Sequence, residues 1–216
     1  MKKSVFVILL VFFISAFSIS MYFVVKETVE DKKQYEVFEN IVSSVQIEDD
    51  NSDYTDEQLK RYIELNTENS DFVGWIKIDG THINYPVMKN STSDYYLHRN
   101  FNKEYSYYGT PYLSDKSDTM KPTDNIVIYG HNMRNGTMFA GLKKYVGRDF
   151  MNAHRTVKFE TTDGVQIFTV TDVLKTNTSD AWYDRITAEG GGRRLVLSTC
   201  YGSGKDGRLL IIAAET

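Results

Sequence analysis

An uncharged apolar stretch close to the N-terminus divides this chain into two parts with different physical requirements. Residues 4–25 carry no charged side chain, and Lys2, Lys3, Lys26 and Glu27 flank them. A stretch of that length can cross a bilayer as a helix. Because such a segment does not contribute to the core of a water-exposed domain, we expect the remainder of the chain to fold around a core of its own.

The charges around this stretch predict its orientation. Two lysines at the start favour a cytoplasmic N-terminus, which places everything after residue 25 outside the cell. A secretory signal peptide has a shorter apolar region, roughly 7 to 15 residues, that ends at a small-residue cleavage site. Residues 15–18, Ser-Ala-Phe-Ser, weakly resemble such a site. We expect a single-pass membrane anchor at residues 1–25, with a cleaved signal peptide as the alternative.

Composition limits what the extracellular part can be. The chain has 216 residues, of which 41% are hydrophobic, which suits one globular domain. A net charge of -4 argues against nucleic-acid binding. No cluster has metal-ligand spacing, so we expect no metal or cofactor. The single cysteine, Cys200, has no partner for an intrachain disulfide, so it is either an inert core thiol or a reactive one.

The residue composition changes twice after the apolar stretch. Residues 27–45 are charged but carry apolar positions at a loose helical spacing, which predicts a juxtamembrane helix. Residues 46–53 are acidic and polar and are typical of a solvated linker. Thr55 and Gln58 form a capping-box pattern that predicts a second short helix. We therefore divide the chain into an anchor (1–25), a helix with linker (26–54) and a globular domain (55–216).

Beyond Asn69 the chain consists of short apolar runs separated by Gly, Asp and Asn, a pattern typical of strands and turns. Asp-Gly pairs at 79–80 and 163–164 indicate hairpins. The expected strands are residues 72–78, 83–87, 108–113, 125–129, 157–160, 165–174, 195–199 and 209–213, with a short helix at 137–145. This pattern predicts a mostly antiparallel β-barrel or sandwich preceded by helices.

Cys200 ends one of the expected strands, and Arg208 begins the next after a Gly-rich loop. If the two strands pair as a hairpin, the guanidinium and the thiol lie at the same edge of the sheet. A neighbouring cation favours the thiolate, which is the nucleophilic form of cysteine. Arginine also supplies fixed donors for the oxyanion of a tetrahedral intermediate. Spacing alone leaves open the alternative that Arg208 only offsets Asp206 or caps the strand end.

Acyl transfer through cysteine also needs a group that protonates the departing amine, usually a histidine. The chain has four histidines: His82, His98, His131 and His154. His131 follows an apolar strand and precedes a polar loop, which favours it. From the residues alone His98 stays a competing candidate.

Several motifs together resemble those of the sortases, specifically class B. Residues 197–200 (Leu-Ser-Thr-Cys) resemble the cysteine motif, and Arg208 stands where the family's arginine is expected. Residues 128–133 (Ile-Tyr-Gly-His-Asn-Met) resemble the histidine motif. The other matching stretches are residues 73–76, 83–87, 95–97 and 136–139. The resemblance runs from about residue 69 to the C-terminus and selects His131 and Arg208 beside Cys200.

This resemblance implies a closed eight-stranded β-barrel with N-terminal helices and short connecting helices, anchored outside a Gram-positive cell. It implies a cysteine transpeptidase that cleaves a C-terminal sorting signal of the Leu-Pro-x-Thr-Gly or Asn-Pro-x-Thr-Asn type. A thioacyl-enzyme would then transfer the surface protein to a cell-wall amine of a peptidoglycan precursor.

Two positions depart from the class B pattern. The connection at residues 176–194 is short, with room for only a turn or two of helix where relatives have a substantial one. Gly202 stands where some relatives carry an acidic residue, so we assign no third carboxylate. The candidates for substrate contact are Leu97, Ser198, Tyr201 and Tyr183, and simple packing is the alternative role for the aromatic ones.

Three other functions remain compatible with the sequence. A pilin-polymerising sortase and a hydrolytic cysteine peptidase would use the same catalytic residues. A membrane-tethered binding module would carry a buried, inert Cys200 distant from His131 and Arg208.

Overall fold

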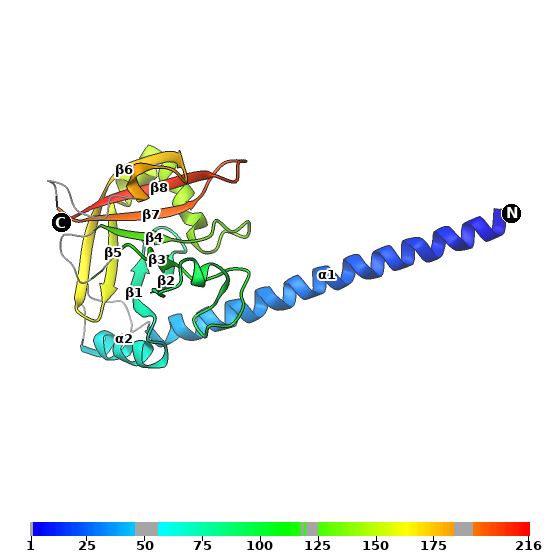
Figure 1. Ribbon diagram of the computed structural model, residues 1–216, viewed down its shortest axis with the longest axis horizontal. Helices are drawn as coiled ribbons and strands as arrows, with labels where there is room; N and C mark the ends of the chain where they lie inside the picture. Colours follow the sequence, from blue (N-terminus) through cyan, green and yellow to red (C-terminus); the bar gives the residue numbers. More distant parts are fainter. Residues whose placement is uncertain (1, 46–55, 118, 120–124, 184–191) are drawn as a thin grey trace. The chain divides into compact units, whose positions relative to one another are not determined.

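A computed structural model describes residues 2–45, 56–117, 119, 125–183 and 192–216. The acidic linker expected at residues 46–53 lies outside this part. The chain divides into two compact units, Met1–Glu39 and Asn40–Thr216. Helix α1, Lys2–Val45, runs without a break through both the expected anchor and the expected juxtamembrane helix (Figure 1).

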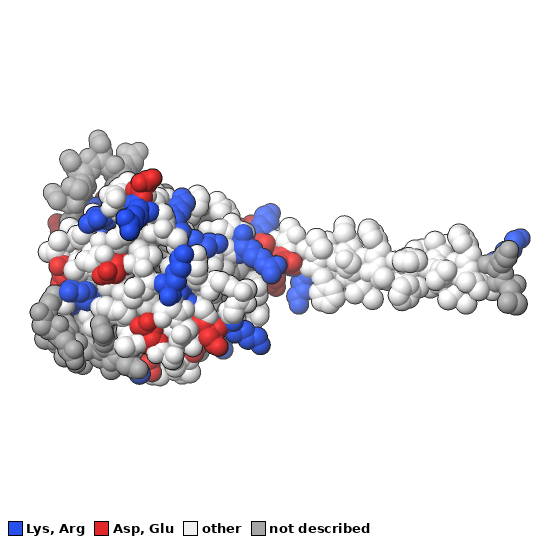
Figure 2. Space-filling model, turned by 90° about the horizontal axis from the view of Figure 1, so that it is seen from above, with Lys and Arg blue, Asp and Glu red and all other residues white. Residues whose placement is uncertain are grey.

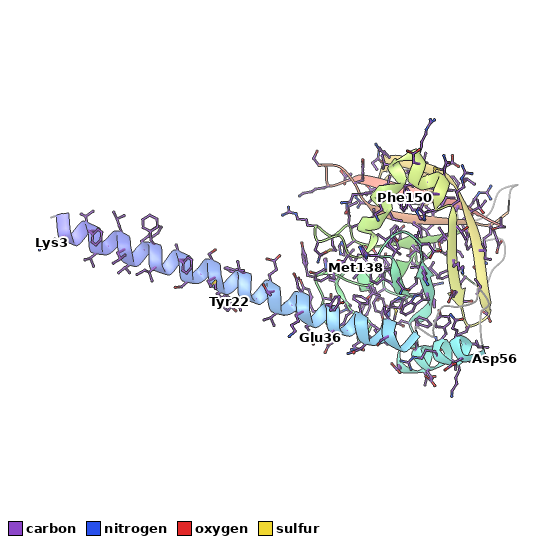
Figure 3. All side chains as sticks on the ribbon, turned by 180° about the vertical axis from the view of Figure 1, so that it is seen from behind. Lys3, Tyr22, Glu36, Asp56, Met138 and Phe150 are labelled. Carbon is purple, nitrogen blue, oxygen red and sulfur yellow. The ribbon has the colours of Figure 1, made fainter. Side chains whose placement is uncertain are left out.

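The apolar residues of α1 do not pack into a protein core. Residues 3–30 are exposed throughout, and Figure 2 shows this stretch without charged atoms over most of its length. In Figure 3, side chains between Lys3 and Tyr22 project from all sides of the helix. Within the described residues, α1 is the one helix long and apolar enough to cross a membrane, a property that signal sequences near an N-terminus share.

Helix α2, Asp56–Glu68, covers one end of the second unit. Asp56 and Glu57 occupy its first turn, where negative charge complements the helix dipole. Tyr62 and Leu65, one turn apart, are fully buried. The Tyr62 ring stacks near that of Trp75 at 6.3 Å between centroids, which attaches the helix to the first strand.

Eight strands close into a barrel in the order β1-β2-β3-β4-β7-β8-β6-β5, with β5 returning to β1. Their bounds are β1 Phe72–Lys77, β2 Asn84–Met88, β3 Tyr112–Leu113, β4 Ile126–Tyr129, β5 Thr156–Thr161, β6 Gly164–Asn177, β7 Arg194–Cys200 and β8 Gly207–Glu215. The pairs β2–β3 and β4–β7 are parallel, and the other pairs are antiparallel. The closed eight-stranded barrel is therefore confirmed.

Strands β4, β7 and β8 are buried on both faces, which explains why their sequences are continuous apolar runs. Alternate residues point into the barrel. On the other face, Val127, Val196, Leu210 and Ile212 form a cluster that Trp182 and Tyr183 cover. Those two aromatic residues belong to the 3-10 turn η3, Ala181–Tyr183. This outer face carries the candidate site.

Two local expectations needed correction. The strand expected at residues 108–113 is reduced to β3, because amides before it are used in a turn: Gly109 donates to the Ser106 carbonyl and Thr110 to the Tyr96 carbonyl. The expected helix at 137–145 is instead a 3-10 helix, η2, Phe139–Val146, followed by α3, Arg148–Ala153. A further 3-10 helix, η1, spans Tyr95–His98.

Candidate active site

Cys200 and Arg208 face each other across the β7–β8 hairpin. They are direct register partners, at the last residue of β7 and the second residue of β8. The next pair, Tyr201 and Gly207, exchanges a backbone hydrogen bond of 3.0 Å, so Cys200 and Arg208 occupy a non-hydrogen-bonded position. There the Cα atoms approach to about 4.5 Å and the side chains lie on the same face. The expected proximity of guanidinium and thiol follows from this register.

The thiol and the guanidinium both remain available for chemistry. Cys200 is exposed, unlike an inert core thiol. Arg208 is half-buried, and its Nη1 donates to the backbone carbonyls of Lys205 and Gly207 at 3.0 and 2.9 Å. In the described part of the chain Arg208 forms no ion pair, Asp206 included. Its charge is therefore not neutralised by a described carboxylate.

Parallel pairing of β4 with β7 brings His131 beside Cys200. Tyr129 is the register partner of Ser198, and the Gly130 amide then donates to the Ser198 carbonyl at 3.1 Å. Beyond it, the Asn132 side chain donates to the Cys200 carbonyl at 2.8 Å. The first bond extends the ladder past the end of β4, and the second ties the following residues to the end of β7 through a side chain. They place residue 131 next to residue 200.

The histidine is half-buried and oriented by a backbone group. Nε2 of His131 lies 2.9 Å from the Leu97 carbonyl oxygen. Burial lowers the pKa of His131, the Leu97 carbonyl raises it, and the nearby charge of His98 lowers it. The His98 ring is exposed and lies 5.6 Å from that of His131 between centroids. The competing candidate is thus a neighbour of His131.

A pocket of about 430 Å³ opens beside Arg208. Of the four expected substrate contacts, Leu97 and Tyr183 line it, whereas Ser198 and Tyr201 do not. Ser198 is buried, and its hydroxyl lies 2.8 Å from the hydroxyl of the pocket residue Tyr183. Tyr201 lies below Lys175, whose Nζ is 5.3 Å from the ring centroid.

Sequence reasoning missed part of the pocket wall. Tyr129 stacks on Tyr183 at 5.9 Å between ring centroids, and burial raises its pKa to about 12. Tyr112 donates to the Asp94 carboxylate at 2.7 Å, and burial followed by this bond raises its pKa. Asp94 itself has a left-handed backbone (φ 57°). The sequence signal was weak, because these residues come from separate segments that only the barrel brings together.

The described residues include no group of three or more His, Cys, Asp or Glu side chains placed to hold a metal ion. The chemistry available at this site is therefore that of a thiol, an imidazole and a guanidinium at the joined ends of β4, β7 and β8.

Comparison with known proteins places this arrangement in a family. Residues 76–216 match the sortase domain. This chain belongs to the sortase family. The match covers most of the barrel and includes Cys200, His131 and Arg208.

The relatives of this sortase are class B proteins. It is 39% identical over 118 residues to sortase B of Listeria monocytogenes, which is 53% of this chain and 46% of the relative. The match therefore spans about half the length of that protein. A solved sortase B from Clostridium perfringens has 30% identity and a TM-score of 0.63, covering 71% of this chain and 98% of the other.

A Staphylococcus aureus sortase B–substrate complex shares the fold, with a TM-score of 0.74. It is 24% identical and covers 87% of this chain and 98% of the other. The L. monocytogenes and C. perfringens relatives support the class B assignment, and the S. aureus complex shows the same fold.

Proposed function

We propose that this sortase is a cysteine transpeptidase that cleaves a C-terminal sorting signal and transfers the surface protein to an amine of the cell wall. The observation that carries the proposal is the Cys200–Arg208 cross-strand pair, which the β4–β7 ladder sets beside His131. The signal is of the Leu-Pro-x-Thr-Gly or Asn-Pro-x-Thr-Asn type.

In this scheme the Cys200 thiolate attacks the carbonyl that follows the threonine of the signal. Arg208 donates to the oxyanion of the tetrahedral intermediate, where a planar cation with several N–H groups acts most effectively. The C–N bond breaks, His131 gives a proton to the departing amine, and a thioester remains on Cys200. An incoming amine attacks the thioester, loses a proton to His131 and restores the thiol.

The pocket beside Arg208 is suited to the acyl donor. Leu97 and Tyr183 provide apolar contacts, and the Arg208 guanidinium reaches the same space. The S. aureus complex contains a substrate, which supports the use of a comparable pocket here. Ser198 and Tyr201 stay predicted contacts, and neither lines the pocket.

Helix α1 supports a single-pass anchor with the barrel outside the cell. Its apolar stretch is long enough to span a bilayer, and the lysines before it favour a cytoplasmic N-terminus. The amine would then come from a peptidoglycan precursor or wall peptide.

The decisive experiment incubates the full chain, in detergent micelles, with peptides carrying each sorting motif, with and without an added amine. Mass spectrometry follows the products. Product joined to the amine supports transpeptidation, and product joined specifically to a pilin lysine supports pilus polymerisation. Hydrolysed peptide alone favours a peptidase. No turnover together with an unmodified Cys200 would refute every enzymatic proposal and leave a binding module.

A further inference from the structure

We propose that the backbone carbonyl of Leu97 positions His131 for catalysis, keeping hydrogen on Nε2 and leaving Nδ1 to exchange the proton in each acyl-transfer step. The proposal rests on the transpeptidase chemistry above and gives Leu97 a role beyond the side-chain contact expected from the sequence. The orientation of His131 then requires no carboxylate beside the ring.

The hydrogen bond to Leu97 decides which ring nitrogen of His131 carries hydrogen. A carbonyl oxygen only accepts, so the 2.9 Å contact with Nε2 requires hydrogen on that nitrogen. A neutral imidazole carries one ring hydrogen, so Nδ1 is then the basic nitrogen. Among the described residues Nδ1 has no hydrogen-bond partner. It is therefore free to take a proton.

Neighbouring backbone hydrogen bonds hold the Leu97 carbonyl in place. The Leu97 amide donates to the Asp94 carbonyl at 3.0 Å, and on either side of Leu97 the carbonyls of Tyr96 and His98 accept from Thr110 and Ser106, each at 3.0 Å. These bonds clamp η1 against the turn at residues 106–110.

Gly109, in the turn at residues 106–110, lies very close to the carbonyls of Tyr96 and Leu97. Its φ is +60°, and a Cβ there would lie 2.4 Å from the Leu97 oxygen and 2.6 Å from that of Tyr96. Only glycine permits so close an approach without moving those carbonyls. The turn therefore restricts where the Leu97 oxygen can point.

With this tautomer, Nδ1 of His131 handles every proton that the reaction moves. The thiol proton of Cys200 moves to Nδ1 of His131, giving a thiolate and an imidazolium. After the thiolate attacks, Nδ1–H passes its proton to the departing amine nitrogen, and the incoming amine later returns one to Nδ1. The Nε2–H bond persists throughout, so the Leu97 carbonyl accepts from a cation during part of the cycle, when such bonds are stronger. A buried carboxylate orients the histidine of serine proteases in a comparable way.

The direct test is nitrogen NMR of the full chain in detergent micelles, with ¹⁵N-labelled histidine. The His131 signals are assigned by their loss in His131→Gln. At a pH where the ring is neutral, we expect Nε2 to give a protonated-type shift and Nδ1 an unprotonated-type shift. The opposite pattern, or an even mixture of tautomers, would overturn the proposal. This readout does not depend on turnover, so a failure of the proposed function would be seen separately.

A pair of glycine variants tests the functional consequence. Gly109→Ala inserts a Cβ against the Leu97 oxygen, whereas Gly192→Ala places one at a similar positive φ (+78°) with no atom within 4 Å. We expect Gly109→Ala to disturb the tautomer and to reduce kcat at least ~10-fold with less effect on KM. Gly192→Ala should leave both unchanged. Activity lost with the tautomer intact, tautomer lost with activity intact, or neither changed would contradict the assigned role.

Discussion

Cys200 and Arg208 are direct partners across the β7–β8 hairpin, at a position where no backbone hydrogen bond separates their side chains. The thiol and the cation are thereby held together by strand register. The same register sets their side chains on the outer face of the barrel, above Val196 and Leu210, because alternate strand residues share a face. The strand residues beneath the site are therefore held in a buried, packed cluster.

Removing the Cys200 thiol should stop the reaction without destabilising the barrel. Cys200→Ala should abolish thioester formation and turnover, measured by mass spectrometry of the protein and the peptide. Because Cys200 is exposed, the free energy of unfolding should change by less than about 0.5 kcal/mol. A variant that still turns over peptide would rule out Cys200 as nucleophile.

The planar donor geometry of the Arg208 guanidinium, and not its positive charge alone, should be required for activity. In Arg208→Lys we expect kcat/KM to fall about 100-fold, because an ammonium lacks the planar set of donors that can serve an oxyanion and the carbonyls of Lys205 and Gly207 together. Arg194→Lys, at the other end of β7, is the matched control and should retain activity. Full activity of Arg208→Lys would refute the oxyanion role.

The Tyr183–Ser198 hydrogen bond should stabilise the pocket wall. Tyr183→Phe keeps the stack on Tyr129 but leaves the buried Ser198 hydroxyl without this partner, so we expect a loss of about 1 kcal/mol in chemical denaturation. Ser198→Ala alone removes the other partner. The double variant should lose less than the two single losses added together, and strict additivity would show that the two hydroxyls do not interact.

The neighbouring imidazole should influence the pH dependence. A protonated His98 opposes a second positive charge on His131 and so lowers the pKa of His131. In His98→Asn this opposition is absent, and the His131 titration, followed by ring nitrogen shifts, should move to higher pH. A larger share of enzyme would then hold the imidazolium at neutral pH. His82→Asn changes an exposed histidine in a turn between strands and serves as the control; an equal shift in both variants would contradict a local effect.

The sequence predicted the part of the site that depends on neighbours in the chain. Cys200 and Arg208 lie on consecutive strands, so a hairpin was enough to bring them together. His131 could not be chosen over His98 from the residues, because its position depends on parallel pairing between β4 and β7, which are far apart in the sequence. His98 lies beside His131, with 5.6 Å between the ring centroids.

The pocket wall was less predictable for the same reason. Tyr112 and Asp94 meet through a side-chain bond between β3 and the start of η1, and neither segment has a pattern that indicates the other. The connection at residues 176–194 was expected to hold only a short helix, and η3 is a single 3-10 turn there, while residues 184–191 lie outside the described part of the chain.

The register of β7 and β8 also has a practical consequence for protein engineering. Residues 202–206 are exposed, and strand pairing on either side, rather than the length of this loop, fixes the distance between the Cys200 thiol and the Arg208 guanidinium. Loop extension costs little free energy when the ends are already held. An affinity tag or a recognition peptide inserted between Ser203 and Gly204 would therefore be carried at the mouth of the site with the catalytic pair still aligned.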